Sequence, residues 1–440
     1  MAATEKLLKA SGVLYTDRRN FYVDPQVTKE LWTDVAPFTT MISNQEMRNV
    51  PDPIFKMFEH RNPWVKQLFL CDGDTDNLDS DNTTNTTVTV DGPSNCSIDD
   101  SLIGHICEVW TDGYGSKKGI VRVDSVTSST VVVVNTLWTS TGSDIALANN
   151  DIFLIIGNAQ GEGTSSPEAW ADELEVVWNS TQIFKTPLQI TGTLLAASLR
   201  GESSELARLR AQKNQEHKMQ KEKAFLFGKR VGGTGLDLQD GSSSDSFADG
   251  GVLDADGNLV RTTYGAVSAI ETYGDSTSTN DYQNIFTVSE ASYSYSNFVD
   301  DMEKVFQYVP EAGVKRAFVG AGALGYWSKI AGTSGMAGNS GWTVNMSDMK
   351  RDSLGFNYKI LETPHGILQL IPAPALRGPY NKYMLIISEE NLFHAQYRSP
   401  MYQTNIKTDN AFDGVKDQYM SDEGVGIQLI ESHHLFKITD

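Results

Sequence analysis

The stretch "ELARLRAQKNQEHKMQKEKAFLFG", Glu205 to Gly228, decides how the rest of the chain is interpreted. Ser203 and Ser204 precede it as capping residues, Glu205 suits the positive first turn, and Gly228 ends the pattern. We therefore predict a helix over residues 205–227, a rod of roughly 36 Å. Its centre, 212–218, contains no apolar residue, so this helix cannot bury a conventional amphipathic face.

The predicted helix is basic although the chain is acidic. It holds six Lys or Arg against three Glu, while the formal charge of the 440 residues is -20. At 100° per residue, four side chains fall within about 80° of one another and form a basic stripe: Arg210, Lys213, His217 and Lys221. Such a stripe belongs either to a solvated helix held by pairs such as Lys218 and Glu222, or to a surface that faces nucleic acid.

The negative charge is concentrated in one segment. Residues 72–184 contain eighteen Asp and Glu against Lys117, Lys118 and Arg122, which gives 3 - 18 = -15. The remainder of the chain is therefore close to neutral, and this segment is predicted to be a separate acidic module.

Composition excludes several classes of protein. No window approaches 18 consecutive apolar residues, so no membrane-spanning helix is expected. The N-terminus, "MAATEKLLKASG", lacks the apolar region of a signal peptide. The three cysteines show no CxxC spacing and predict reduced thiols rather than a disulfide framework or zinc site. A sequence pI near 4.7 argues against a general nucleic-acid binder.

The acidic segment has the pattern of a small β-domain. Strand-like runs, "HICEVW", "GIVRVDSV", "TVVVVNTLW" and "DIFLIIG", are separated by turns rich in Gly, Ser and Asp. This spacing predicts an antiparallel barrel or sandwich, closed by the linker-like "GEGTSSPEA" at Gly161. After the acidic segment, a long strand is predicted from Val176. From Val314 the pattern becomes mixed α and β, with a hairpin around "TPHG".

Two motifs bear on cofactors and metals. "GAGALG", Gly320 to Gly325, has the spacing of a dinucleotide-binding turn, but the following residues do not supply the second strand and acid that this site needs. Asp72, Asp74 and Asp76 resemble the start of a calcium loop that lacks its glycine and its final glutamate. We find no catalytic constellation, and we expect no cofactor, no metal site and no enzyme activity.

Several blocks together resemble one protein family. Val177 to Arg230 is similar to the section of tailed-phage (Caudovirales) major capsid proteins that leads into their long spine helix. Arg316 to Ile330 resembles the apical strand and helix of these proteins, and Ile386 to Ile438 resembles their closing segment. Val27 to Ser43 resembles the arm before their extended loop. The closest group is the one that carries a small β-domain inserted in that loop.

The resemblance implies an α+β protein with the Hong Kong phage (HK-97-type) capsid fold plus an inserted antiparallel β-barrel or sandwich. The expected parts are an N-terminal arm (1–50), an extended loop (51–191) with the acidic β-domain inserted at about 72–169, a peripheral domain (192–313) with the spine helix 205–227, an apical domain (314–390) and return strands (391–440).

The resemblance also implies a function. Such a chain self-assembles, in the host cytoplasm, into hexamers and pentamers of an icosahedral virion capsid around packaged double-stranded DNA. Its expected partners are other copies of itself, DNA by weak non-specific contact, and a decoration, scaffolding or portal protein, but no membrane. The residues expected to face DNA are Arg208, Arg210, Lys213, Lys218, Lys221 and Lys223. No position matches the Lys and Asn that some relatives crosslink.

An alternative interpretation is a β-rich surface or glycan-binding protein. It would be centred on Gly104 to Gly157, with Trp110 and Trp138 as side chains that stack on sugars. The absence of a signal peptide favours the capsid interpretation.

Overall fold

The computed structural model describes most of the chain. The described residues are 36–45, 47–60, 68–72, 77–80, 85–90, 98–163, 174–197, 204–230, 252–276, 283–307, 313–333, 350–351, 357–406 and 413–439. Among them, no helix is long and apolar enough to cross a membrane.

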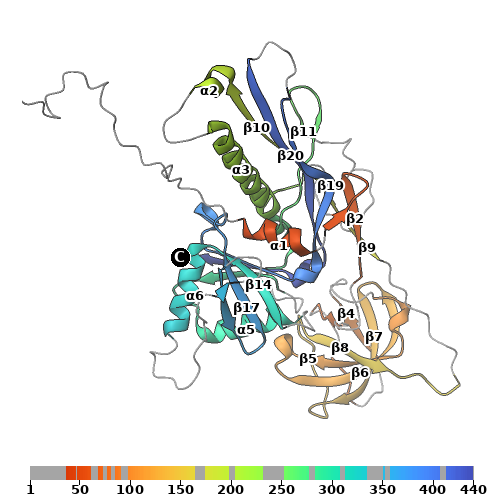
Figure 1. The fold of residues 1–440 in the computed structure, drawn as a ribbon. Coiled ribbons are helices and arrows are strands. Elements are labelled where there is room, and N and C mark those ends of the chain that lie inside the picture. Colours follow the sequence, from red (N-terminus) through yellow and green to blue (C-terminus); the bar gives the residue numbers. More distant parts are fainter. Residues whose placement is uncertain are drawn as a thin grey trace, which may run out of the picture.

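An elongated four-stranded sheet supports the long helix. Its strand order is β1 (Met47–Asn49), β19 (Leu392–Gln403), β20 (Gly414–Ile427) and β10 (Gln182–Thr191). The β10 and β20 strands pair antiparallel along the whole length of β10. Helix α3 (Glu205–Phe227) packs across β10 and β20, as Figure 1 shows. The short helix α2 (Gly192–Ala196) follows β10 at the far end of the sheet.

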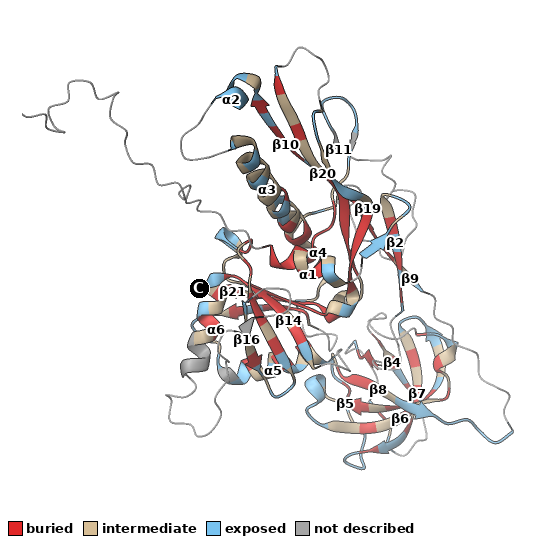
Figure 2. Ribbon diagram, viewed as in Figure 1, coloured by how far each residue is buried: buried red, intermediate tan, exposed pale blue. Residues whose placement is uncertain are grey.

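The predicted long helix is confirmed at both ends. Ser204 is the N-cap, and its side chain accepts a hydrogen bond from the amide of Ala207. Gly228 closes the C-terminus, where an added Cβ would lie 2.4 Å from the carbonyl oxygen of Ala224 and 2.5 Å from that of Thr263. Only the second half of α3 reaches the core, and Figure 2 shows the first half partly exposed.

A seven-stranded mixed sheet forms the other large unit. In spatial order its strands are β13 (Ile285–Ser289), β21 (His434–Thr439), β18 (Tyr383–Ile387), β14 (Val314–Val319), β17 (Ile367–Pro372), β16 (Asn357–Glu362) and β15 (Lys350–Arg351). The predicted hairpin around "TPHG" is the antiparallel pair β16 and β17. One face of the sheet packs against α5 (Tyr295–Phe306) and α6 (Ala321–Thr333).

The opposite face of the seven-stranded sheet joins the two units. Alternate strand residues such as Phe318 and Leu385 face a second core that is supplied by α1 (Pro37–Gln45), the end of α3 and α4 (Ala266–Tyr273). The C-terminal end of α3, with Phe225 and Leu226, is therefore anchored in the core shared by both sheets. Apolar packing therefore fixes α3 at its C-terminal end, beyond the centre that lacks apolar residues.

A two-stranded ribbon leads to a separate β-barrel. The ribbon is β2 (Ile54–Glu59) paired with β9 (Glu175–Ser180). Between them in the chain lie six antiparallel strands in the order β3 (Leu68–Leu70), β8 (Ile152–Asn158), β5 (His105–Trp110), β6 (Lys117–Ser128), β7 (Val131–Thr139) and β4 (Thr86–Thr89). A bridge between Cys71 and Val90 joins the outer strands, so the sheet closes on an apolar core. The remaining strands, β11 (Val252–Leu253) and β12 (Leu259–Val260), pair only with each other.

Two expectations differ from the structure. The strand predicted from Val176 is divided at Thr181, whose amide donates to the carbonyl of Pro53, so β9 joins the ribbon while β10 joins the four-stranded sheet. The boundary expected at residue 313 also divides one sheet, because β13 and α5 pack with the strands of 314–390. Both differences result from pairing between strands that are distant in the sequence. Local sequence patterns do not predict such pairing.

Candidate functional site

Three fully buried carboxylates lie along strand β20. Asp417, Asp422 and Glu423 have no exposed surface, although they occupy one strand of a sheet that packs against a largely polar helix. An ionised carboxylate in such surroundings is stable only if cations and hydrogen-bond donors compensate it. We call these three residues the acidic row. The sequence pattern does not predict the acidic row, although "KDQYMSDEG" places acids within a run that otherwise has the pattern of a strand.

The side chains that compensate the acidic row come from distant parts of the chain. Lys221 of α3 lies 3.0 Å from Glu423, with His394 of β19 3.3 Å away on the same carboxylate oxygen. Arg210, also on α3, lies 2.9 Å from Asp417. Asp422 is flanked by two arginines at 3.3 Å and 3.2 Å: Arg261 and Arg398. The basic helix therefore supplies part of the counter-charge for the sheet beneath it.

Hydrogen bonds keep two of these carboxylates ionised. Burial acts to raise the pKa of Asp417, but donation from Tyr402, from the amide of Asn405 and from Arg210 holds that pKa below its usual value. Burial likewise opposes ionisation of Glu423, and His394 and Lys221 together lower its pKa. Both groups thus remain charged at neutral pH and hold α3 against β20.

His217 continues this contact between α3 and the sheet. It is buried, its Nδ1 is 3.0 Å from the Thr186 hydroxyl, and its Nε2 is 3.1 Å from the Ser421 hydroxyl. Burial, assisted by the charge of Lys221, lowers the pKa of His217 to about 4. The imidazole is therefore neutral at pH 7 and bridges β10 and β20.

The expected basic stripe does not form an open side of the helix. His217 and Lys221 face the sheet and are nearly covered, while Arg210 keeps 38% of its side chain exposed but is paired with Asp417. The expectation that the stripe is open to solvent is wrong at His217 and Lys221. These side chains point toward β20, where they contact the buried side chains of that strand. Sequence periodicity located the stripe and could not show which way it faces.

The other predicted DNA-facing residues lie elsewhere on α3. Arg208 pairs with Glu205, and Lys213 lies 2.7 Å from Glu216, both across one turn of the helix. Lys218 and Lys223 are exposed, and within the described part of the chain neither has an ion pair. These two ammonium groups are the most available to an external anion.

A fourth buried acid fixes the start of helix α1. Glu222 accepts hydrogen bonds from the amides of Phe38 and Thr39, at 3.1 Å and 2.7 Å, and from the Thr39 hydroxyl at 2.7 Å. A carboxylate at a helix N-terminus satisfies orphan amides and complements the helix dipole. Burial raises the pKa of Glu222 against these contacts. The helix that follows the N-terminal segment is thus bound directly to α3.

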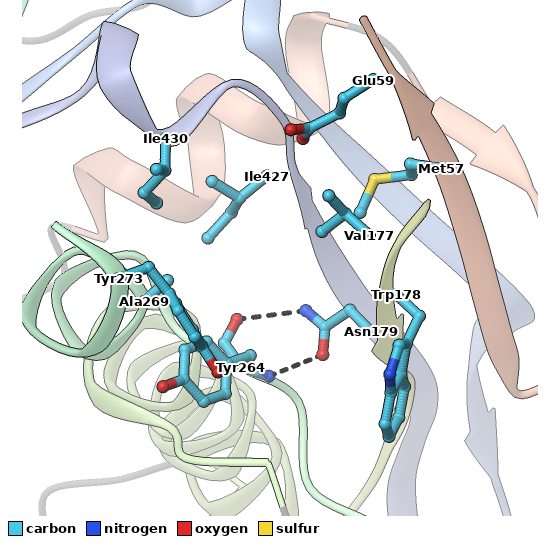
Figure 3. Close-up of a pocket in the computed structure, with 10 residues that line it drawn as sticks. All are labelled: Met57, Glu59, Val177, Trp178, Asn179, Tyr264, Ala269, Tyr273, Ile427 and Ile430. Carbon is cyan, nitrogen blue, oxygen red and sulfur yellow. Dashed lines mark hydrogen bonds between the residues drawn. The ribbon is translucent and has the colours of Figure 1, made fainter. Parts of the chain in front are cut away.

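A small cavity marks the junction of the ribbon with the body of the protein. It encloses about 30 Å³ and lies between ribbon residues such as Met57 and Val177 and residues of α4 and β20 (Figure 3). Asn179 spans its floor: its Nδ2 donates to the carbonyls of Tyr264 (3.2 Å) and Val425 (2.6 Å), and its Oδ1 accepts from the amide of Tyr264 (2.9 Å). This volume holds only about two or three water molecules. The junction is therefore a structural joint rather than a substrate pocket.

The glycine motif and the acidic motif that resemble cofactor and calcium sites are the last features to place in the structure. The glycine turn before α6 is covered by Asn381, whose side-chain oxygen and carbonyl accept from the amides of Gly322 and Ala323, both at 3.1 Å. An added Cβ on Gly320 would lie 2.3 Å from the Asn381 carbonyl oxygen, so the glycines permit this close packing. Of the calcium-like acids, Asp74 and Asp76 lie outside the described residues. No group of three metal-binding side chains is found in the part of the chain that could be searched.

The contacts described above hold parts of the fold to one another, as in a structural protein. A rod-like helix is clamped onto an elongated sheet by charge pairs, and a ribbon and barrel extend from the body (Figure 1). A family model described as SU10 major capsid protein matches residues 26–434, and the chain belongs to this family. It is therefore a phage major capsid protein with a structural role in the virion capsid. The α+β architecture and the family together confirm the predicted HK-97-type fold.

Comparison with other known proteins adds only distant similarities. No curated protein matches the chain. The capsid of a native GTA particle has a TM-score of 0.41 and 9% identity, covering 99% of this chain and 100% of that chain. The mature capsid of bacteriophage PhiM1 has a TM-score of 0.37 and 8% identity, covering 64% and 78%. Mycobacterium phage Patience has a TM-score of 0.35 and 12% identity, with the same coverage.

Proposed function

We propose that copies of this chain form the hexamers and pentamers of an icosahedral head that is assembled in the host cytoplasm around double-stranded DNA. The chain would act only through binding, without catalysing a reaction. The domain limits given above belong to this proposal, except that β13 and α5 join the strands of 314–390. The barrel at about 72–169 would be an outward projection. A decoration, scaffolding or portal protein would be a further partner.

The β2–β9 ribbon carries this proposal. Its inner face, with Phe55, Met57 and Val177, packs on Phe393 and Ala395 of β19. Its outer face instead presents Phe58, which is 64% exposed and lies opposite Val176. A two-stranded ribbon is marginal on its own, and an exposed aromatic ring on it indicates a surface that another chain covers.

Charge suggests which side of the shell each part faces. The acidic segment holds -15 of the total charge, so it would be repelled by packaged DNA and would lie outside. The side of α3 turned away from β20 would face the DNA, through Lys218 and Lys223 and, more weakly, through the locally paired Arg208 and Lys213. Arg210 and Lys221 have a different role in this proposal, because the acidic row already engages them.

Electron microscopy of the purified full-length protein tests the assembly proposal. We expect rings or shells of uniform size for the unmodified chain. The substitution Phe58→Asp places a charge in the proposed contact and should leave folded, unassembled subunits. Leu137→Asp is the matched control, because Leu137 is also an exposed apolar residue, 52% accessible, but lies on the barrel. Persistent monomers of the unmodified chain, or normal shells from Phe58→Asp, would contradict the proposal.

A further inference from the structure

The outer surface of the barrel carries an aromatic and charged cluster that shell formation does not explain. It consists of Trp110 at the end of β5, Tyr114 in the following turn, Glu108, Lys117 and Trp138 on β7. We call this set the barrel platform. Trp138 is 48% exposed and Tyr114 is 38% exposed, whereas the barrel's core side chains are almost fully buried. In Figure 1 the strands β5, β6 and β7 lie side by side in the barrel.

Direct contacts connect the members of the platform. The indole Nε1 of Trp110 donates to Glu108 Oε2 at 3.0 Å, and Lys117 Nζ lies 2.5 Å from Glu108 Oε1. The same ammonium lies 5.8 Å from the ring centroid of Trp138, and the ring of Tyr114 lies 6.4 Å from that of Trp110. The hydrogen bond from Lys117 lowers the pKa of Glu108, so a charged donor and a charged acceptor are fixed between two indole rings.

Strand register sets the spacing of the two indoles. Trp110 is on β5 and pairs with Lys117 of β6, while Trp138 is on β7 and pairs with Ile120 of β6. Two strand intervals, roughly 10 Å, separate the tryptophans across the sheet, and the offset from Lys117 to Ile120 adds roughly 10 Å along the strand. Their Cα atoms are therefore about 14 Å apart, so a polysaccharide that contacts both indoles would place them on sugar rings that are not adjacent.

The turn that presents Tyr114 is strained. Tyr114 has a backbone φ of 57°, a left-handed conformation that a side chain other than glycine adopts at a cost of order 1 kcal/mol. The amide of Tyr114 donates to the carbonyl of Thr111 at 3.0 Å, and its ring stays 38% exposed at the edge of the platform. Strain of this kind is typical of residues held for contact with a ligand.

The aromatic rings and the charged pair of the platform are suited to binding sugars. A pyranose ring has an apolar C–H face that stacks on an indole, and hydroxyl groups that both donate and accept hydrogen bonds, which Glu108 and Lys117 can match. Residues 72–184 as a whole have a charge of -15, which disfavours anionic polymers, although the three cations of this segment, Lys117, Lys118 and Arg122, all lie on β6. Trp138 and Tyr114 are exposed, whereas Trp110 is half-buried against the cluster of Leu68, Leu70 and Ile152 and presents only part of its ring. This arrangement suits a polymer that passes over the strands.

We propose that the barrel platform binds neutral polysaccharides, with Trp138 and Trp110 stacking on two sugar rings and the Glu108–Lys117 pair hydrogen-bonding to hydroxyls between them. This site is additional to the structural role of the chain and does not depend on assembly. One platform offers little area and binds weakly, whereas many copies on one particle would raise the avidity by roughly 100-fold or more.

Affinity electrophoresis of the folded full-length protein tests the proposal. The probes are laminarin, dextran and mannan as neutral polysaccharides, with polygalacturonate as the anionic control. We expect at least one neutral polymer to retard the protein, and polygalacturonate to have no effect. Trp138→Ala should weaken this binding at least tenfold, while Trp138→Phe, which keeps an aromatic face, should recover most of it.

Ile156→Ala is the matched control, since Ile156 is 52% exposed on β8 and is not a member of the platform. It should bind as the unmodified protein does. The proposal is overturned if no neutral polymer binds, if Trp138→Ala binds normally, or if Ile156→Ala loses as much binding as Trp138→Ala. Because the assay measures binding to the platform and not the formation of shells, failure here would leave the assembly proposal unaffected.

Discussion

Lys221 of helix α3 and Glu423 of strand β20 form an ion pair across 3.0 Å in which the carboxylate is fully buried. The pair explains why an acidic protein contains a basic helix. The helix neutralises acids of the sheet that supports it, and electrostatic contact replaces the apolar face that its centre lacks.

Removing one partner of this pair should destabilise the fold. Lys221→Met leaves Glu423 buried with only His394 beside it, and breaking a buried pair in this way costs about 3 kcal/mol. Urea denaturation of the unassembled full-length protein at pH 7 measures this loss. Lys218→Met is the matched control: Lys218 is exposed on the same helix, and its loss should change the free energy of unfolding by less than about 0.5 kcal/mol.

The double variant Lys221→Met, Glu423→Met separates pairing from packing. It removes both charges, so it should recover roughly half of the stability that the single variant loses. If Lys221→Met and Lys218→Met are equally stable, the ion pair does not hold α3 in place.

The helix itself could be predicted from sequence because its signals are local. Ser204, Glu205 and Gly228 mark its ends through capping and backbone geometry, and the structure places the helix where they indicate. The β-hairpin around "TPHG" was predictable for the same reason.

The surroundings of the helix could not be predicted in this way. The partners of Lys221 and Arg210 lie about 200 residues further along the chain, at Glu423 and Asp417, and periodicity carries no information about such contacts. The angular stripe was identified correctly as a set of residues, but its direction depends on the buried acids of β20. Asn179 is a similar case, since its partners Tyr264 and Val425 are also distant.

Stability should fall as the pH is lowered below neutrality. The pKa of His217 is lowered to about 4 in the folded protein, so protonation favours the unfolded chain, where histidine has a pKa near 6.5. Its contribution is complete above about pH 6.5 and decreases at lower pH by about 1.4 kcal/mol per pH unit for one proton. The lowered pKa values of Asp417 and Glu423 act in the same direction at still lower pH.

Denaturation curves between pH 7.5 and pH 4.5 check this sign. In His217→Gln the amide can still hydrogen-bond to Thr186 or Ser421 but cannot titrate, so its stability should depend less steeply on pH in this range. An unchanged slope in His217→Gln would show that His217 is not the group responsible.

The joint between ribbon and body should depend on the amide of Asn179. In Asn179→Asp a carboxylate oxygen replaces the Nδ2 that donates to the carbonyls of Tyr264 and Val425, so acceptors would face acceptors in a buried site. We expect a loss of about 2–4 kcal/mol, measured by thermal unfolding. Asn158→Asp, at an exposed position on β8, is the control and should be nearly neutral. Equal melting temperatures for both variants would contradict this role.

Contact with DNA should depend on the lysines that the sheet does not engage. Each lysine that contacts a phosphate releases a counterion, so removing it lowers the salt dependence of binding by about one unit in the slope of log affinity against log salt. Lys218→Gln with Lys223→Gln should therefore reduce the slope by about two and weaken retention of a double-stranded fragment. Lys185→Gln removes one exposed charge from β10, where the alternate residues Phe184 and Thr186 face α3, so Lys185 points to the opposite side of the sheet. It should leave the slope unchanged. If Lys185→Gln and Lys218→Gln alter binding equally, DNA contacts the protein through general charge rather than through the outer side of α3.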